Sequence, residues 1–565
     1  MDFIKKEKKP LLFLMFVFFL GITFFWLKQG WIIIDTGREL YIPWQMLKGE
    51  VLYKDIFNIY GALSYQINAL AYLVFGQKIE TLYGLGVLNS FFIVLGLYYL
   101  SREFLNRIFS VLIVLFVMST TIFSTTLFNF NLPYSYAIVY AFSSFLFSVL
   151  FLIKYVKRPR PLFAYLSSFF AGISFATKYE YILYPFLLAY VFCFLRPLRK
   201  KDLLKGIGFF LLTPIISFSI LFLQGLTLHD CVQTILYVKK MAVAPSLIYF
   251  YKNNAGTYFN PKLVLLSFIN FCIFSLYYFL LIGANILNEK YSPKPLRQII
   301  PLLLLFVTFI FVFGSGIKGF GFFPILNLLL LLFFAKPIFE NKPLFILMLC
   351  ALIGSMKTFF LLDVYIYGAF VIPLLLLSIV AFILFYSETL KKKTVKRAIK
   401  HTLILLLVVY TAFIGLRQAY STGLKGYLLK TEKGNLYADE SVYTCYSGLI
   451  NYINQNLKKT DRVVILPETP FVNFVTGRDS DNYYHSLIPM YFETFGEDHI
   501  IDHFKKTRPE YFVLNNRRTI DYGHVYICDD YAQKFCSYMK QNYDSVKIFK
   551  EGYYQMIVYK RKDLK

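Results

Sequence analysis

The stretch GWIIIDTGRELYIPWQMLKGEVLYKDIFNIYGALSYQINALAYLVFG, residues 30–76, decides how the rest of the chain is interpreted. It follows directly on an apolar run at residues 11–27, yet it is rich in charge. A polar segment that begins where an apolar run ends is typical of a loop at a membrane surface. Its seven charged side chains are those of Asp35, Arg38, Glu39, Lys48, Glu50, Lys54 and Asp55.

The composition of the whole chain is that of a membrane protein. Of its 565 residues, 57% are hydrophobic and only 16% are charged, against about 25% charged residues in soluble domains. Apolar runs long enough to cross a bilayer recur along the chain. No small-residue cleavage site follows the first run, so we expect it to be retained and not removed as a signal peptide. Clear runs are residues 11–27, 82–100, 108–127 and 206–226.

The basic residues predict the orientation of the spans. The net charge is +26, and Lys and Arg gather in short clusters between apolar runs, as in cytoplasmic loops. We therefore expect no nucleic-acid partner, a cytoplasmic N-terminus and about thirteen transmembrane helices that end near Tyr420. The clusters are residues 5–9, 101–107, 154–160, 196–205, 288–297, 336–342 and 391–400.

The composition changes after residue 420, where the chain becomes polar. An odd number of spans places residues 421–565 outside the cytoplasm, and alternating strands and helices predict a small α/β domain there. Residues 1–420 then form the membrane domain. A disulfide among Cys445, Cys528 and Cys536 would suit an oxidising compartment, but the sequence leaves the pairing open. The predicted strands are residues 462–467, 510–516, 545–550 and 553–561, and the predicted helices are residues 497–506 and 529–543.

The first outer loop, residues 29–80, shows a helical pattern. We expect two helices that lie flat at the membrane interface, each ending at a glycine and anchored by Tyr and Trp. Thr36 and Glu39 match a capping box, which would explain the polar DTGRE segment as a helix start with Asp35 as a second cap. The alternative is that Asp35 performs chemistry just outside the membrane.

Sugar transfer to an acceptor hydroxyl needs a base, and the leaving lipid phosphate needs cations. Asp35 is the candidate base. Asp55 is a second candidate acid, with a solvated loop charge as its alternative. Together the two carboxylates could hold a divalent metal, although no CxxC zinc spacing is present. Candidate phosphate ligands near the outer ends of spans are Arg38, Lys178, Lys318 and Lys357; snorkelling cations and, for Lys318, a tight turn are the alternatives.

The order of motifs in the first hundred residues resembles the polyprenyl-phosphate-dependent GT-C glycosyltransferases, in the branch of the protein O-mannosyltransferases and the lipid A aminoarabinose transferase. Asp35 corresponds to the acidic residue that opens the family's first outer loop. Relatives often have Lys-Pro-Pro-Leu where this chain has Tyr60-Gly61-Ala62-Leu63. The matching segments are RELYIPWQMLKG, LYKDIF, IYGALSYQINALAYLVFG and LNSFFIVLGLYYLSREFLNR, and residues 172–185 and 354–377 resemble later family segments.

The resemblance implies a GT-C-like membrane domain and a transferase that uses a polyprenyl-phosphate-linked sugar. It implies that Asp35 is the catalytic base, with Glu39 and Tyr60 as supporting residues of the first loop. The acceptor would be a glycan, lipid or protein on the outer face of the cytoplasmic membrane. The alternative function is a non-enzymatic transporter or flippase of lipid-linked glycans, which would carry ionisable or broken segments within its spans.

Overall fold

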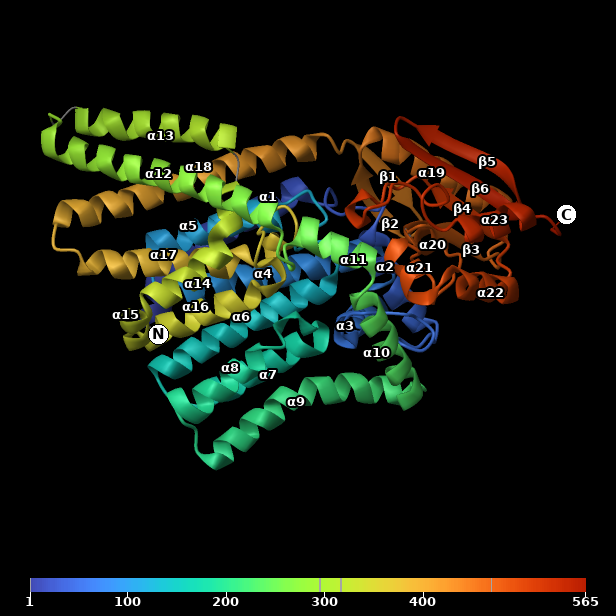
Figure 1. The fold of residues 1–565 in the computed structure, drawn as a ribbon, viewed down its shortest axis with the longest axis horizontal. Coiled ribbons are helices and arrows are strands. Elements are labelled where there is room, and N and C mark those ends of the chain that lie inside the picture. The colour runs from blue at the N-terminus through green and yellow to red at the C-terminus, as the bar shows by residue number, and fades with distance from the viewer. Residues whose placement is uncertain (1, 294–295, 316–317, 469, 565) are drawn as a thin grey trace.

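The computed structural model describes residues 2–293, 296–315, 318–468 and 470–564 (Figure 1). A body of long helices occupies one side of the molecule, and a domain that contains all the named strands lies at one end of this body. The N-terminal end lies at the opposite end of the helical body from the strand-containing domain (Figure 1).

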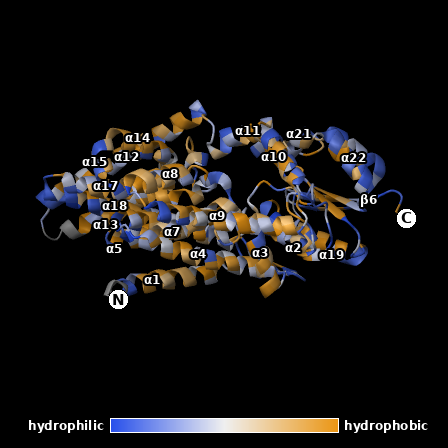
Figure 2. Cartoon of the chain, turned by 90° about the horizontal axis from the view of Figure 1, so that it is seen from below, coloured by the Kyte–Doolittle hydropathy of each residue, from blue (hydrophilic) through white to orange (hydrophobic). Residues whose placement is uncertain are grey.

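Seven helices of the described chain are long and apolar enough to cross a membrane. Counting the bent pair of residues 299–314 and 319–333 as one span gives eight. The chain is therefore a multi-pass membrane protein, and apolar residues cover much of the helical body (Figure 2). The expected count of thirteen is not confirmed, because five further apolar helices have only 10–17 residues. The seven are α1 (Asp2–Phe25), α4 (Ile79–Arg102), α6 (Tyr136–Lys157), α9 (Lys200–Leu223), α12 (Pro261–Tyr291), α17 (Ile372–Thr389) and α18 (Lys393–Gly423).

Shorter helices complete the helical body. Several end in π or 3-10 turns, so the backbone changes direction close to the ends of the long helices. They are α5 (Arg107–Val117), η1 (Met118–Ile122), α7 (Pro161–Thr177), η2 (Tyr179–Tyr181), α8 (Tyr184–Tyr190), η3 (Val191–Leu195), α13 (Leu296–Ser315), η5 (Lys318–Phe322), α14 (Phe323–Phe333), α15 (Ala335–Glu340), α16 (Lys342–Gly354), η6 (Met356–Thr358) and η7 (Tyr367–Phe370). A second polar segment between α9 and α12 contains α10 (Leu228–Ala242), α11 (Pro245–Phe250) and η4 (Tyr251–Ala255).

The first loop contains two helices, α2 (Asp35–Leu47) and α3 (Ala62–Phe75), where two were predicted. The prediction that Trp44 anchors α2 in the membrane interface is wrong. Trp44 is buried and packs edge-on against Phe474 of the C-terminal domain, with ring centroids 6.1 Å apart. The apolar stripe of α2 is covered by that domain and not by lipid headgroups. Helix α3 does expose Leu73 and Phe75, as expected of an element beside lipid.

The C-terminal domain is built on a mixed sheet with strand order β3-β4-β6-β5. Strand β3 pairs parallel with β4, whereas β6 runs antiparallel to both β4 and β5. All four strands overlap the stretches predicted as strands from the sequence. Their bounds are β3 (Val463–Leu466), β4 (Tyr511–Asn515), β5 (Tyr543–Glu551) and β6 (Tyr554–Arg561).

Helices cover both faces of this sheet. On one face Val463 and Val513 pack with α19 and α20, and on the other Val464 and Phe512 pack with α22 and α23. A β1-β2 hairpin attaches the domain to the helical body, because Tyr437 N–H donates to the Leu27 carbonyl over 2.9 Å. The remaining bounds are β1 (Tyr427–Thr431), β2 (Gly434–Ala438), α19 (Glu440–Asn456), α20 (Phe471–Thr476), α21 (Pro489–Phe495), α22 (Glu497–Thr507), η8 (Ile520–Tyr522) and α23 (Gln533–Asn542).

Candidate active site

A cavity of about 570 Å³ lies where the first loop, one end of the membrane helices, the α10–α11 segment and the C-terminal domain meet. Its wall is a mixture of aromatic rings and charged side chains. Four of the residues predicted from sequence as base or phosphate ligands come together here from distant parts of the chain, together with Tyr60. These four are Asp35, Arg38, Lys178 and Lys357.

Asp35 is the first residue of α2, and its carboxylate forms an ion pair with Arg38 over 2.8 Å. The Arg38 guanidinium also donates to the Tyr134 carbonyl over 2.6 Å and lies 3.3 Å from Glu39 Oε1. With three partners in the protein, Arg38 is held in one orientation and fixes Asp35 at the cavity wall. The donors of Arg38 are therefore engaged by the protein itself, which makes it a positioning group for Asp35.

Glu39 is completely buried and does not line the cavity. Its carboxylate accepts hydrogen bonds from the Tyr65 hydroxyl over 3.0 Å and from the Tyr136 N–H over 2.8 Å. Burial raises the pKa of Glu39, and the nearby Arg38 opposes this rise. Glu39 therefore ties α2 to α3 and to the start of α6, which supports the wall that carries Asp35.

The capping box suggested by Thr36 and Glu39 is not formed. Helix α2 begins at Asp35, so Thr36 lies inside the helix and not before it. The Thr36 hydroxyl accepts from the Trp31 N–H over 2.7 Å, and Glu39 is used by Tyr65 and Tyr136. Tertiary contacts account for Thr36 and Glu39, and they leave the Asp35 carboxylate to Arg38 and the cavity.

Lys178 and Lys357 share one carboxylate. Glu180 Oε1 lies 3.3 Å from Lys178 Nζ and 2.6 Å from Lys357 Nζ. Burial lowers the pKa of Lys178 to about 7 despite this ion pair. Burial also disfavours the Glu180 charge, but the two lysines outweigh it and lower the pKa of Glu180 to about 2. Two cations on one anion leave this end of the cavity with positive charge.

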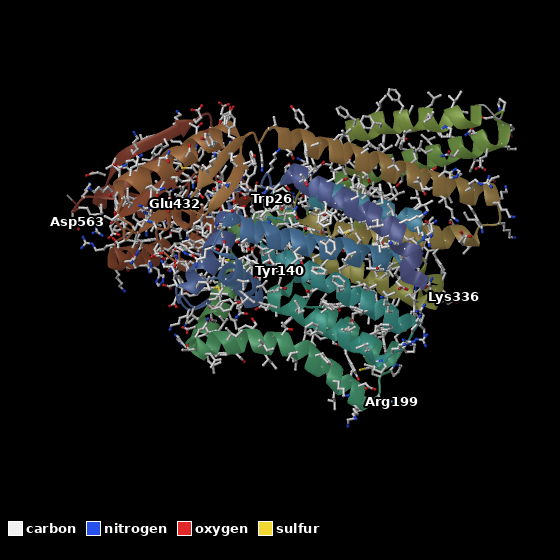
Figure 3. The ribbon with its side chains drawn as sticks, turned by 180° about the vertical axis from the view of Figure 1, so that it is seen from behind. Trp26, Tyr140, Arg199, Lys336, Glu432 and Asp563 are labelled. Atoms are coloured by element: carbon white, nitrogen blue, oxygen red, sulfur yellow. A yellow bond between two sulfur atoms is a disulfide. The ribbon has the colours of Figure 1, made fainter. Side chains whose placement is uncertain are left out.

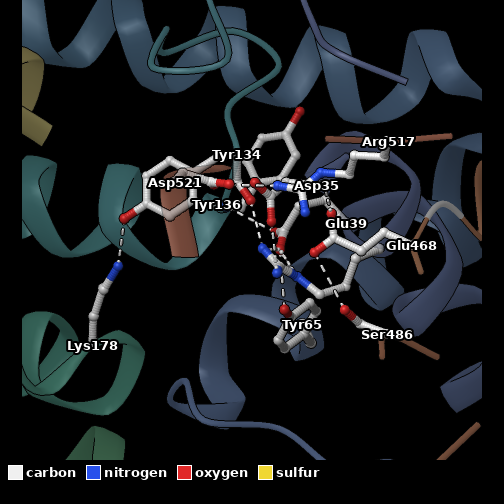
Figure 4. Close-up of polar contacts among 11 residues, drawn as sticks. Asp35, Glu39, Tyr65, Tyr134, Tyr136, Lys178, Glu468, Ser486, Arg517 and Asp521 are labelled. Atoms are coloured by element: carbon white, nitrogen blue, oxygen red, sulfur yellow. Dashed lines mark hydrogen bonds and ion pairs between the residues drawn. The ribbon is translucent and has the colours of Figure 1, made fainter. Parts of the chain in front are cut away.

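Aromatic rings surround the two lysines. Lys178 Nζ donates to the Tyr134 hydroxyl over 2.7 Å (Figure 4), and it lies 4.7 Å from the centroid of the Tyr60 ring. Lys357 Nζ lies 3.6 Å from the centroid of the Tyr367 ring. Ring faces attract cations, so Tyr60 supports Lys178.

The C-terminal domain contributes a second group of charges that sequence reasoning did not identify. Arg517 lies between Glu468, at 3.3 Å, and Asp521, at 3.4 Å. These side chains are directed toward Asp35 (Figure 4). Burial raises the pKa of Glu468, Arg517 lowers it, and the charge of Asp35 adds to the rise. Glu468 and Arg517 each follow the carboxyl end of one of the two parallel strands, where ligands commonly bind in such sheets. Their position directly after two predicted strands is the sequence feature that could have identified them.

The remaining predicted residues lie elsewhere. Asp55 accepts a hydrogen bond from the Val51 N–H over 2.9 Å and lines a separate hollow with Asp481 and His503. The structure therefore does not bring Asp55 together with Asp35 at a shared metal site. Among the described residues, no three His, Cys, Asp or Glu side chains are placed to hold a metal. The side chain of Lys318 lies outside the described part of the chain.

Fold and site together define a multi-pass membrane protein with a charged, aromatic cavity between its helical body and its C-terminal domain. No family model and no curated protein matches the sequence. Among solved structures, the chain is similar to the archaeal oligosaccharyltransferase AglB from Archaeoglobus fulgidus in complex with an inhibitory peptide and a dolichol-phosphate. That likeness has 11% identity, covers 90% of this chain and 70% of that chain, and has a TM-score of 0.47.

The chain is also similar to ArnT from Cupriavidus metallidurans bound to undecaprenyl phosphate, with 10% identity, 98% of each chain covered and a TM-score of 0.43. A third likeness is to the Archaeoglobus fulgidus oligosaccharyltransferase tethered with an acceptor peptide, with 10% identity, 100% of this chain and 75% of that chain covered and a TM-score of 0.47. We take the function of this protein from the side chains of its own cavity.

Proposed function

We propose that this protein is an integral-membrane glycosyltransferase that moves a sugar from a polyprenyl-phosphate carrier to an acceptor hydroxyl on the extracytoplasmic face. One observation carries the proposal: Asp35, Lys178 and Lys357 line the same cavity at the ends of the membrane helices. A carboxylate and a pair of cations are the groups that such a transfer requires. The resemblance of the first loop to GT-C enzymes leads to the same reaction.

The donor phosphate has a natural place at Lys178 and Lys357. Among the described residues, Glu180 is the one carboxylate paired with both cations, so a phosphate is the second anion that balances their charge. Charge-assisted hydrogen bonds from lysine are strong when they are shielded from water. As the bond between the sugar and the phosphate oxygen breaks, negative charge accumulates on the phosphate, and the lysines stabilise it.

Asp35 acts as the base that removes the proton of the acceptor hydroxyl. The acceptor oxygen attacks the anomeric carbon as the carbon–oxygen bond to the phosphate breaks, and the acceptor proton moves to the Asp35 carboxylate. Polyprenyl phosphate leaves, and attack from the opposite face inverts the anomeric centre. Arg38 holds Asp35 in place through the 2.8 Å ion pair, so little reorganisation is needed at the moment of reaction.

The extracytoplasmic location of the site is part of the proposal, and two observations support it. The α6–α7, α8–α9 and α17–α18 turns lie at the end of the helical body away from the strand-containing domain (Figure 1), and these turns are basic. The C-terminal domain contains the disulfide Cys528–Cys536, a bond typical of oxidising compartments. Both favour a cytoplasmic side at the basic turns and an outer side at the cavity.

The test is sugar transfer by the purified protein from a radiolabelled polyprenyl-phosphate sugar. We expect Asp35→Asn to lower the rate by a factor of about 10²–10⁴, the usual contribution of a general base. Asp55→Asn is the matched control and should keep the wild-type rate, because Asp55 lies in a separate hollow. Equal rates for wild type and Asp35→Asn would refute the base. No sugar release from any polyprenyl-phosphate donor would favour the transporter function.

A further inference from the structure

The wall that the C-terminal domain contributes to the cavity has unused hydrogen-bonding capacity. The three contacts among Ser486, Glu468, Arg517 and Asp521 measure 3.3, 3.3 and 3.4 Å, whereas charge-assisted N–H···O bonds are usually about 2.7–2.9 Å. Arg517 Nη1 has no hydrogen-bond partner among the residues that the structure describes. The Arg517 side chain is only 6% exposed, and it lines the cavity.

The backbone around these side chains is held in place independently of them. The side-chain amide of Asn515 donates to the backbone carbonyl of Glu468 over 2.9 Å, and its Oδ1 accepts from the backbone N–H of Arg517 over 3.0 Å. Asn254 of the η4 turn donates to the Asp521 carbonyl over 2.9 Å. The wall is therefore preorganised from two parts of the chain before any ligand arrives, as binding sites require.

The chemistry of the wall specifies what fits. Glu468 Oε2 is free to accept from a hydrogen-bond donor and Arg517 Nη1 is free to donate to an acceptor among the described residues. Asp521 exposes 35% of its side chain and lines the cavity beside them. Vicinal hydroxyl groups supply both at the spacing of a planar carboxylate or guanidinium. Aromatic rings suited to the apolar face of a sugar stand in the same cavity, since Tyr491 lines it and Tyr522 stacks on Phe250 with centroids 5.2 Å apart.

An extended peptide fits this wall less well. Peptides often bind by adding a strand to an exposed sheet edge. The edge strand nearest Glu468 is β3, and all four of its residues are buried. No free backbone edge is therefore offered at this side of the sheet within the described residues.

From these observations we infer that Glu468, Arg517 and Asp521 form a saccharide-binding subsite, so that the acceptor hydroxyl belongs to a sugar. This inference deepens the proposed function and rests on it, because a sugar bound here is an acceptor only if the protein transfers sugars. Asp35 lines the same cavity as the lysine pair and this subsite. A bound sugar would therefore present a hydroxyl to the base.

The experiment is saturation-transfer NMR on the full-length protein in detergent, with methyl glucoside, galactoside and mannoside as probes. We expect saturation of at least one methyl hexopyranoside by the wild type and loss of at least 80% of that signal in Asp521→Asn. Asp529→Asn is the matched control, because Asp529 is an exposed aspartate that does not line the cavity. Arg517→Lys should also weaken the signal, since lysine lacks the planar fork of donors.

Three results would overturn the inference. The first is that no hexopyranoside receives saturation from the wild type. The second is that Asp521→Asn and Asp529→Asn give equal signals. The third is transfer of the donor sugar to an N-acetyl-seryl peptide amide and to none of the three glycosides, which would make the acceptor a peptide. Because the NMR measurement needs no donor, its failure is distinguishable from a failure of the proposed transfer, which is measured by sugar release.

Discussion

At the scale of residues, the cavity separates two kinds of charge. Lys178 and Lys357 with their shared Glu180 form a positive end, whereas Glu468, Arg517 and Asp521 form an end with one more carboxylate than cation. Asp35 lines the same cavity. This division matches a reaction in which a phosphate leaves at one side and a hydroxyl arrives at the other.

The lowered pKa of Lys178 predicts a pH dependence. Below about pH 7 the ammonium is protonated and pairs with the donor phosphate; above it the free enzyme loses this cation. We therefore expect kcat/KM for the lipid-linked donor to fall as the pH rises through 7, because kcat/KM reports the free enzyme. Loss of a charge-assisted hydrogen bond of about 1.5–3 kcal/mol corresponds to roughly a 10- to 100-fold decrease.

The control for this pH profile is Lys178→Arg. A guanidinium stays protonated over the whole range, so the decrease near pH 7 should disappear in any Arg variant that retains activity. The profile is measured as the initial rate at donor concentrations well below KM. A decrease of the same size and midpoint in both proteins would show that another group titrates.

At the scale of elements, the cavity depends on how closely α2 approaches the C-terminal domain. A Cβ added at Gly37 would lie 2.4 Å from the backbone nitrogen of Phe471 at the start of α20. A backbone atom cannot move aside as a flexible side chain can. The absence of a side chain at Gly37 is therefore what allows the wall with Asp35 to face the wall with Glu468.

We predict that Gly37→Ala separates these two walls. Overpacking of this kind costs about 1–3 kcal/mol, so the melting temperature in detergent should fall and sugar transfer should fall with it. Gly84→Ala in α4 is the matched control, since a Cβ there meets nothing within 4 Å. Equal melting temperatures for the two variants, measured by intrinsic fluorescence, would contradict the close approach.

At the scale of the whole molecule, the basic turns between the helices gather at the end of the helical body away from the C-terminal domain. Arg199 and Lys336 lie at the end of the helical body farthest from Glu432 and Asp563 of the C-terminal domain (Figure 3). The positive-inside rule predicts that this basic end is cytoplasmic. In the orientation that we propose, the cavity lies on the outer side of the membrane.

Membrane-impermeant maleimide tests this orientation. We expect a cysteine introduced by Ser545→Cys, on the exposed face of β5, to be labelled in intact cells. A cysteine introduced by Thr394→Cys, at the exposed start of α18, should be labelled only after the membrane is permeabilised. Wild-type protein gives the background from its own cysteines. The reverse labelling pattern would place the C-terminal domain in the cytoplasm.

Sequence patterns located one half of the site. Hydropathy and charge asymmetry place Asp35, Lys178 and Lys357 at the outer ends of apolar runs, and residues at the same membrane depth can meet. The burial of Trp44 and the position of Glu468 in the cavity wall depend on how the C-terminal domain packs against the first loop. The periodicity of the sequence does not encode this packing. Asp55 is selected from the sequence although it lies outside the cavity. A carboxylate that closes a turn can have the same sequence context as one that performs chemistry, so the sequence does not separate the two.

The most direct test of the central claim is a cryo-EM structure of the protein with polyprenyl phosphate. We predict that the phosphate contacts Nζ of both Lys178 and Lys357, on the side of the cavity that faces Asp35. Weaker phosphate density in the Lys178→Met, Lys357→Met double variant would support this assignment. Phosphate density away from both lysines, for example beside the apolar pocket between α12 and α17, would contradict it.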